Sequence, residues 1–400
     1  MNFFENKRTR IILISTGIVG ILVAVGLYLF FRGDADGDGS NSDSFFGTLV
    51  NIIEEQPMGG DPLSGGVIVG EAEGGEETQL VLYRVSDEPV VGATISPDDK
   101  RLRYFKHATG LFEADFTGTN ETRISHVTIP AILDVQWTPS KSYAIISAYT
   151  DGGIRRSYTH FSGTSTASSA FLPNDIEEIT TSLTDEMIAY TVSKEGKTIL
   201  FTARPNNTNI KNIYTLPVPD FELSWPAANS IALKQKSSAY APSVLYTLNP
   251  TSKSLTRLLA EKEGLDVLWP TGGKQMLTME TSREGTVLTL NITSLEKNTV
   301  TPLPFATLPE KCAWVPKNTT VLYCAVPEAI PRGANLPDEW WQGVVSFNDV
   351  LWRIDVETGE QKQILPVHQL DAMDLFLSDD ESFLFFTNKK DGLLWSLKLN

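Results

Sequence analysis

The sequence predicts an all-β protein, a seven-bladed β-propeller closed by strands from both ends of the domain and preceded by one N-terminal transmembrane helix. Three observations support this prediction: a motif that recurs about every 44 residues, turns rich in glycine and proline, and one long uncharged apolar run near the N-terminus. Of the 400 residues, 41% are hydrophobic and 20% are charged, so most of the chain can bury a core.

The uncharged apolar run occupies residues 11–31. At a rise of about 1.5 Å per residue, a helix of this length spans about 30 Å, the thickness of a bilayer's hydrocarbon core. Lys7, Arg8 and Arg10 precede the run and acidic residues follow it, which predicts a cytoplasmic tail at residues 1–10 and an extracytoplasmic remainder. A cleaved signal peptide is the alternative, but the run is long and bulky residues follow its only small-residue site. We therefore expect a single-pass protein of the cytoplasmic membrane.

An acidic, glycine-rich segment follows at residues 33–78. Its first 45 residues contain eleven acidic side chains, eleven glycines and no lysine or arginine. Such a segment repels itself and has little apolar surface to bury, so it is expected to form a flexible stalk. Its root-mean-square reach would be about 35–40 Å, enough to hold a domain clear of the membrane.

The remaining residues, 79–400, consist of a repeated pattern in which a short strand ends at a bulky marker residue and a turn leads into an apolar strand. The markers are Ile95, Trp137, Thr181, Trp225, Trp269, Trp314 and Leu377. Successive markers are 42, 44, 44, 44, 45 and 63 residues apart. The first five spacings are typical of one four-stranded propeller blade, and the last is typical of a blade with an insertion.

The ends of the repeated region predict how the ring closes. The seventh repeat stops after three strands, and an alternating strand at residues 79–85 supplies the fourth. A strand contributed from each end removes the exposed sheet edges that would otherwise aggregate. An α-solenoid of similar period is the alternative, but proline and β-branched residues are too frequent for helices of 10–15 residues.

The turn Ser96-Pro97-Asp98 after the first marker resembles turns of TolB-like and other WD-repeat-like propellers. Motifs in the sixth repeat resemble a signature of membrane-anchored propeller proteins from small-genome bacteria, an uncharacterised family. These motifs are Cys312-x-Trp314, Tyr323-Cys324-Ala325-x-Pro327, Pro337-Asp338-x-Trp340-Trp341-x-Gly343 and Phe347-x-Asp349-x-x-Trp352-x-Ile354-Asp355. The resemblance implies topology and location but no activity.

Acidic residues recur three positions before the markers. The seven positions are Gly92, Asp134, Glu178, Glu222, Asp266, Lys311 and Asp374, five of them acidic. Because the first strand of each blade lines the central channel, we expect these carboxylates to form a ring near its mouth. Such a ring could bind Ca²⁺ or a basic ligand group. The alternative is that acidic residues here only favour turns in an acidic chain.

Cys312 and Cys324 lie six residues on either side of a turn centred at Asn318. This symmetry places them opposite one another on a hairpin, where a disulfide can form outside the cytoplasm. Two buried reduced thiols are the equally weighted alternative.

The insertion in the sixth repeat, at residues 327–346, contains the adjacent residues Trp340 and Trp341 and three prolines. Large side chains on a proline-stiffened loop are suited to contacting a partner, because they bury much area with little loss of entropy. The alternative is that one or both tryptophans fold back onto their own blade.

The sequence contains no nucleophile elbow, P-loop, dinucleotide-binding motif or zinc motif, so we expect no enzyme and no cofactor beyond Ca²⁺ at the acidic ring. The net charge of −16 argues against nucleic acid. The predicted function is that of a membrane-anchored propeller that binds or scaffolds a protein or another partner in the cell envelope. The alternative is an enzyme that acts on envelope glycans or peptides through the channel-mouth carboxylates.

Overall fold

The computed structural model describes residues 67–71, 79–125, 128–162, 166–216 and 220–399. The chain divides into two compact units, 1–60 and 61–400, and every described residue belongs to the second unit. The expected tail at 1–10 and the expected membrane helix at 11–31 lie outside the described residues. Among the residues that are described, no helix has the length and apolar character needed to cross a bilayer.

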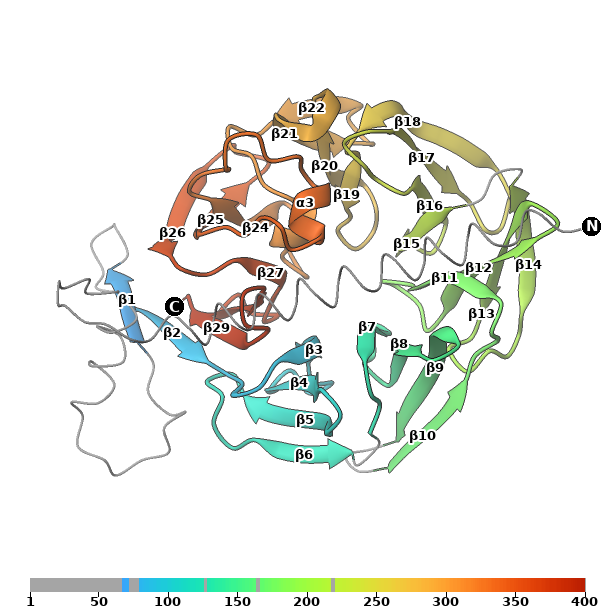
Figure 1. Ribbon diagram of the computed structural model, residues 1–400, viewed down its shortest axis with the longest axis horizontal. Helices are drawn as coiled ribbons and strands as arrows, with labels where there is room; N and C mark the ends of the chain where they lie inside the picture. Colours follow the sequence, from blue (N-terminus) through green and yellow to red (C-terminus); the bar gives the residue numbers. More distant parts are fainter. Residues whose placement is uncertain (1–66, 72–78, 126–127, 163–165, 217–219, 400) are drawn as a thin grey trace, which may run out of the picture. The chain divides into compact units, whose positions relative to one another are not determined.

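The described residues form seven antiparallel sheets arranged as a ring of blades, which confirms the predicted seven-bladed propeller (Figure 1). The first strand of each repeat is the innermost strand of its blade and ends within two residues of the marker residue. In order of blades 1 to 7, the innermost strands are β3 (Val90–Ile95), β7 (Ile132–Trp137), β11 (Ile176–Thr181), β15 (Phe221–Ala227), β19 (Asp266–Leu268), β23 (Cys312–Trp314) and β27 (Ala372–Leu377).

Two middle strands follow each innermost strand. The second strands are β4 (Arg101–Lys106), β8 (Tyr143–Thr150), β12 (Ile188–Lys194), β16 (Ser230–Gln235), β20 (Gln275–Thr281), β24 (Val321–Pro327) and β28 (Phe383–Asn388). The third strands are β5 (Gly110–Asp115), β9 (Gly153–Ser162), β13 (Lys197–Ala203), β17 (Pro242–Leu248), β21 (Leu288–Ser294), β25 (Asp349–Asp355) and β29 (Leu394–Lys398).

The outermost strands of blades 1 to 6 complete the sheets at the rim. They are β6 (Thr122–Ser125), β10 (Thr166–Phe171), β14 (Lys211–Leu216), β18 (Leu255–Glu263), β22 (Thr299–Pro302) and β26 (Gln361–His368). Short helices occur only in connections within the described part of the chain: η1 (Arg283–Gly285), η2 (Pro309–Lys311) and α3 (Asp338–Trp341).

Blade 7 is built from both ends of the domain. Strand β2 (Gln79–Arg84) pairs antiparallel with β29, so the predicted closing strand is confirmed. A further strand, β1 (Val67–Glu71), pairs with the free edge of β2 and makes this sheet five-stranded. This strand departs from the expectation of a wholly flexible stalk over residues 33–78. Its β-branched run Val-Ile-Val favours a strand beside an unpaired edge.

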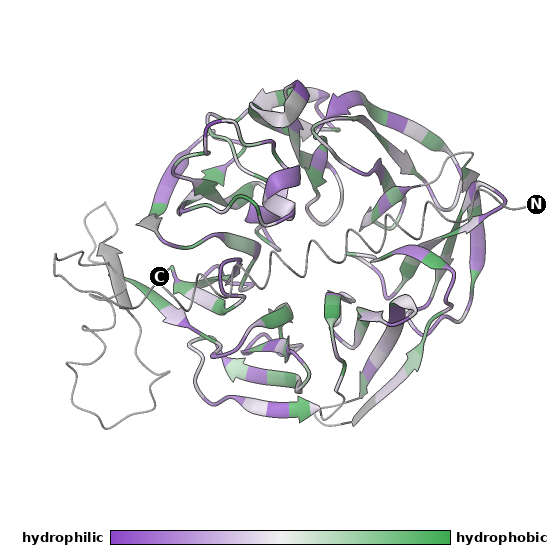
Figure 2. Cartoon of the chain, viewed as in Figure 1, coloured by the Kyte–Doolittle hydropathy of each residue, from purple (hydrophilic) through white to green (hydrophobic). Residues whose placement is uncertain are grey.

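The hydrophobic core lies between the blades. Each of the seven clusters of buried apolar side chains joins two neighbouring blades. At the closure, for example, Leu102 and Tyr104 of blade 1 pack with Phe385 and Leu394 of blade 7. Apolar residues are accordingly distributed around the whole ring rather than gathered on one side (Figure 2). Ring closure therefore completes the core as well as the sheet.

Cys312 of β23 and Cys324 of β24 are direct partners in the antiparallel register, and their sulfur atoms form a disulfide. The bond lies near the channel, where the innermost strand of blade 6 has only three residues. It joins this short strand covalently to its neighbour. The structure therefore contains the disulfide rather than two reduced thiols.

We predict that the double substitution Cys312→Ala/Cys324→Ala lowers the free energy of unfolding. The bond closes a loop between residues 12 positions apart, for which the chain-entropy model gives about 2–3 kcal/mol. Denaturant titration of the wild-type and variant proteins measures the difference. An unchanged midpoint with an unchanged slope would contradict the prediction.

Candidate functional site

The innermost strands line the channel and all point the same way along it. The parallel bridge between Ser182 and Trp225, in adjacent blades, is one example. The innermost strands start on one face of the ring, here called the mouth face. Because successive strands of a blade alternate in direction, the loops between second and third strands lie on this face too. The insertion of blade 6 is one of these loops, since it connects β24 to β25.

The seven predicted ring positions lie at the channel near the mouth face. Six are in innermost strands: Gly92, Asp134, Glu178, Glu222, Asp266 and Asp374. Lys311 ends η2, directly before β23. The ring is not a set of free carboxylates, because several of its members are paired with basic side chains that the repeat pattern did not indicate.

Lys234 of β16 joins two members of the ring. Its Nζ lies 2.5 Å from Glu222 Oε2 and 3.0 Å from Asp266 Oδ1, and it also donates to Ser237 Oγ at 2.7 Å. Burial acts to lower the pKa of Lys234, but the charges of Asp266 and Glu222 outweigh it and raise this pKa. Two blades thus share one buried ammonium group.

Glu178 has a weaker partner. Its Oε2 lies 4.0 Å from an Arg156 nitrogen, and that guanidinium also donates to the carbonyl oxygens of Ile176 and Glu177. Burial and the charge of Glu222 raise the pKa of Glu178. The carboxyl group is therefore easier to protonate than an exposed glutamate.

Asp374 occupies the corresponding position in blade 7. Its φ of 52° belongs to the left-handed region, which Gly92, with φ of 64°, adopts at the same position in blade 1. Asp374 is exposed at the channel, and partial desolvation by the surrounding strands, with a smaller contribution from the charge of Asp134, raises its pKa to about 6. The side chain of Asp134 itself accepts a hydrogen bond from Gln136 Nε2 at 2.9 Å.

Lys311 replaces the carboxylate in blade 6 and is fully buried. Its Nζ lies 2.7 Å from Asp349 Oδ2 and 2.5 Å from Asp371 Oδ1, and it donates to the carbonyl oxygen of Ala372 at 2.9 Å. Burial raises the pKa of Asp349 to about 6, although Lys311 acts in the opposite direction. These groups join blade 6 to the strand entering blade 7.

The insertion is attached to this buried ion-pair network. Trp340 is only 2% exposed, and its Nε1 donates to both oxygens of Asp371 at 3.1 and 3.2 Å. The Lys311 ammonium lies 5.4 Å from the Trp340 ring centre. Trp340 was expected to contact a partner, and this expectation is corrected: satisfying the buried carboxylate of Asp371 draws its indole into the blade.

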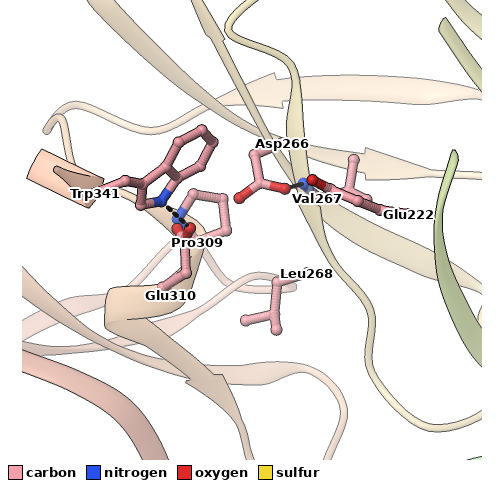
Figure 3. Close-up of a pocket in the computed structure, with 7 residues that line it drawn as sticks. All are labelled: Glu222, Asp266, Val267, Leu268, Pro309, Glu310 and Trp341. Carbon is pink, nitrogen blue, oxygen red and sulfur yellow. Dashed lines mark hydrogen bonds between the residues drawn. The ribbon is translucent and has the colours of Figure 1, made fainter. Parts of the chain in front are cut away.

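Trp341, in contrast, is 39% exposed and faces an open cleft. The cleft has a volume of about 350 Å³ and is lined by Glu222, Asp266, Val267, Leu268, Pro309, Glu310 and Trp341. Trp341 and Glu310 lie on one side, and Asp266 and Glu222 lie on the other (Figure 3). We call this the mouth cleft.

Glu310 is the carboxyl group of the mouth cleft without a basic partner among the described residues. Its Oε1 accepts a hydrogen bond from Trp341 Nε1 at 2.6 Å, while its buried Oε2 has no hydrogen-bond partner there. Burial and the negative charge of Asp266 raise the pKa of Glu310 to about 8. Glu310 is therefore protonated more readily than an exposed glutamate, and a cation in the cleft would favour its ionised form.

The described residues contain no group of three or more histidine, cysteine, aspartate or glutamate side chains that could hold a metal ion. Three carboxylates of the ring instead face basic groups: Glu222 and Asp266 face Lys234, and Glu178 faces Arg156. A Ca²⁺ site at the ring stays an untested prediction.

Two residues of the site were missed from the sequence. Lys234 follows three apolar residues in a strand predicted to be buried, and a lysine in such a run is a signal for a buried ion pair. Glu310 precedes Lys311 outside the repeated position, so the spacing could not identify it. Its role depends on the turn of η2 and on the position of Trp341.

No protein-family model matches the chain, and no curated protein matches its sequence. Several solved structures are similar. Oligogalacturonate lyase from Vibrio parahaemolyticus matches with a TM-score of 0.56 at 7% identity, over 84% of this chain and 98% of that one. Tricorn protease matches with a TM-score of 0.52 at 12% identity, over 82% of this chain and 35% of that one.

TolB from Acinetobacter baumannii is also among the matches, with a TM-score of 0.43 and 12% identity over 79% of this chain and 65% of that one. At such identities, the likeness to the lyase and to tricorn protease shows the fold alone. The propeller expected from the repeats is thus confirmed, whereas activity must be argued from the site.

We predict that Lys311→Met destabilises the protein by about 3–5 kcal/mol, because two buried carboxylates would lose their shared cation. Lys274→Met is the matched control, since Lys274 is 70% exposed in its ion pair with Glu296 and such pairs contribute about 1 kcal/mol or less. Denaturant titration compares the two variants. Equal, small effects would show that the buried network does not stabilise blade 6.

The raised pKa of Glu310 predicts a pH-dependent stability difference. Between the unfolded value of about 4.3 and the folded value of about 8, the folded state binds more protons. This contribution to stability is therefore lost as pH rises through about 8. Glu310→Gln should gain melting temperature relative to wild type from pH 6 to pH 9. A constant difference across this range would contradict the assignment.

Proposed function

We propose that this chain is a membrane-anchored binding protein whose propeller receives a basic side chain of a partner protein in the mouth cleft. The observation that carries the proposal is the charge imbalance there. Glu222, Asp266 and Glu310 line the cleft, while Lys234 is shared by the first two. An arginine or lysine of a partner would supply the missing cation and ionise Glu310.

Trp341 supports a protein as the partner. Its half-exposed indole borders the cleft, and a large aromatic side chain next to a charged pocket is typical of binding hot spots. The loop that carries it is held in place by neighbouring blades. Asp338 accepts a hydrogen bond from the backbone N–H of Ala239 at 2.8 Å, and Leu336 N donates to Gly285 O at 3.2 Å. A preorganised contact surface loses less entropy on binding.

The membrane location belongs to the same proposal and is supported by the sequence. The uncharged run at residues 11–31 would anchor the chain, and the basic residues before it would remain in the cytoplasm. The segment that follows would hold the propeller on the outer side of the cytoplasmic membrane. The disulfide between Cys312 and Cys324 is compatible with an oxidising compartment.

An enzyme acting on glycans or peptides is the second candidate, and one observation favours it. Glu310 has a raised pKa and lies in the same cleft as Asp266, which is ion-paired with Lys234. A proton donor beside an ionised carboxylate is the arrangement that general acid–base catalysis requires. Trp341 would then provide a surface on which a sugar ring could stack.

The test uses the full-length chain in detergent micelles and a glycine-rich pentapeptide with one central arginine. Titration calorimetry should detect binding that tightens from pH 6 to pH 9, because cation binding lowers the pKa of Glu310 and releases its proton. The same peptide with neutral citrulline should bind at least tenfold more weakly. Glu310→Gln should abolish the pH dependence, and Trp341→Ala should weaken binding.

Phe171→Ala is the control variant, because Phe171 is 69% exposed on the outermost strand of blade 2. It should bind the arginine peptide like wild type. Equal binding of the arginine and citrulline peptides would refute the proposed cation site. Hydrolysis of glycan or peptide fragments that disappears in Glu310→Gln would instead support the enzyme.

A further inference from the structure

A second pocket lies farther along the channel, where the innermost strands end. Its volume is about 420 Å³, and five of the marker residues line it: Ile95, Trp137, Trp269, Trp314 and Leu377. The markers gather there because each terminates an innermost strand and all these strands run in one direction. We call this the base pocket; it shares only Leu268 with the mouth cleft, and its proposed ligand does not depend on the function proposed for that cleft.

The base pocket combines an apolar wall with a lysine. Lys141 is on the turn between β7 and β8 and lines the pocket with Leu183, Leu375 and Phe376. The backbone of Lys141 is held in place, because its N–H donates to Thr138 O at 2.8 Å and its carbonyl oxygen accepts from Arg103 Nη1 at 3.3 Å. The turn thus presents this side chain from a defined position.

The Lys141 ammonium group has no ion pair with any described residue. The nearby carboxylate of Asp379 is paired with Lys317 at 2.7 Å, and Glu186 accepts a hydrogen bond from Ser140 N at 2.8 Å. Burial lowers the pKa of Lys141, although Asp379 and Glu186 oppose this shift. A partly buried cation without an ion-pair partner gains free energy when an anion binds.

A second polar group of the base pocket also lacks a partner. Trp269 is buried, and its Nε1–H has no acceptor among the described residues. A buried indole N–H without an acceptor is costly. The pocket therefore offers one cation and apolar walls, and the unpartnered N–H of Trp269 is buried in its wall.

We propose that the base pocket binds an apolar monocarboxylate, with the carboxylate at Lys141 and the hydrocarbon part against the tryptophan and leucine side chains. A single negative charge matches the single ammonium group, while Asp379 disfavours a dianion such as phosphate. The volume suits a ligand of small-molecule size. Either a fatty acid or the C-terminus of an apolar peptide carries this chemistry.

The experiment uses the full-length chain in nanodiscs, with empty nanodiscs as the blank. Equilibrium dialysis compares hexanoate, N-acetyl-leucine and the neutral hexanamide. At least one of the two carboxylates, hexanoate or N-acetyl-leucine, should bind at least tenfold more tightly than hexanamide. Preference for hexanoate would indicate a lipid-derived ligand, and preference for N-acetyl-leucine would indicate a peptide C-terminus.

Lys141→Met should bind acid and amide alike, while Lys141→Arg should keep the preference for the acid. Lys274→Met is the matched control, because Lys274 lies in the corresponding turn of blade 5 and is exposed. It should retain wild-type binding, and thermal melting of all variants checks that each is folded. The proposal is overturned if no carboxylate binds, if amide and acid bind equally to wild type, or if Lys141→Met keeps the preference.

Discussion

The pairing of β2 with β29 is the constraint on which the rest of the ring depends. It joins Val81 to Lys398 and Arg84 to Trp395, residues that lie at opposite ends of the domain. Each blade buries its apolar faces only against its two neighbours, so an open ring would expose two blade surfaces at once. Closure is therefore a condition for the core and for the channel that the innermost strands enclose.

A closed ring also accommodates ionisable side chains that would be costly elsewhere. Lys234 and Lys311 are both buried at the channel, each between two carboxylates from different blades or their connecting segments. The positive charge of each buried ammonium group is compensated by two carboxylates. Because one carboxylate would suffice to neutralise it, each cluster carries a net negative charge. The result is a rigid network that links neighbouring blades. Glu310 and Lys141 stand out because each lacks such compensation.

The two ends of the channel differ in chemistry because of where each repeat places its polar and bulky residues. The position three residues before each marker lies near the mouth face and mostly holds a charged side chain. The marker itself lies near the base of the channel and mostly holds a bulky side chain. The mouth cleft is therefore rich in carboxyl groups, while the base pocket is lined by tryptophan and aliphatic residues around Lys141. The two ends of the channel thus present ionisable groups of opposite charge.

The sequence by itself determined the number of blades, the closing strand and the approach of Cys312 to Cys324, because these follow from regular spacing and from antiparallel register. It also located the acidic positions at the channel. Only the tertiary structure decided which carboxylates are compensated, since Lys234 meets Asp266 across a boundary between blades that no local pattern encodes. It likewise separated Trp340 from its neighbour Trp341, because hydrogen bonding to the buried Asp371 fixes one indole inside the blade and leaves the other at the cleft.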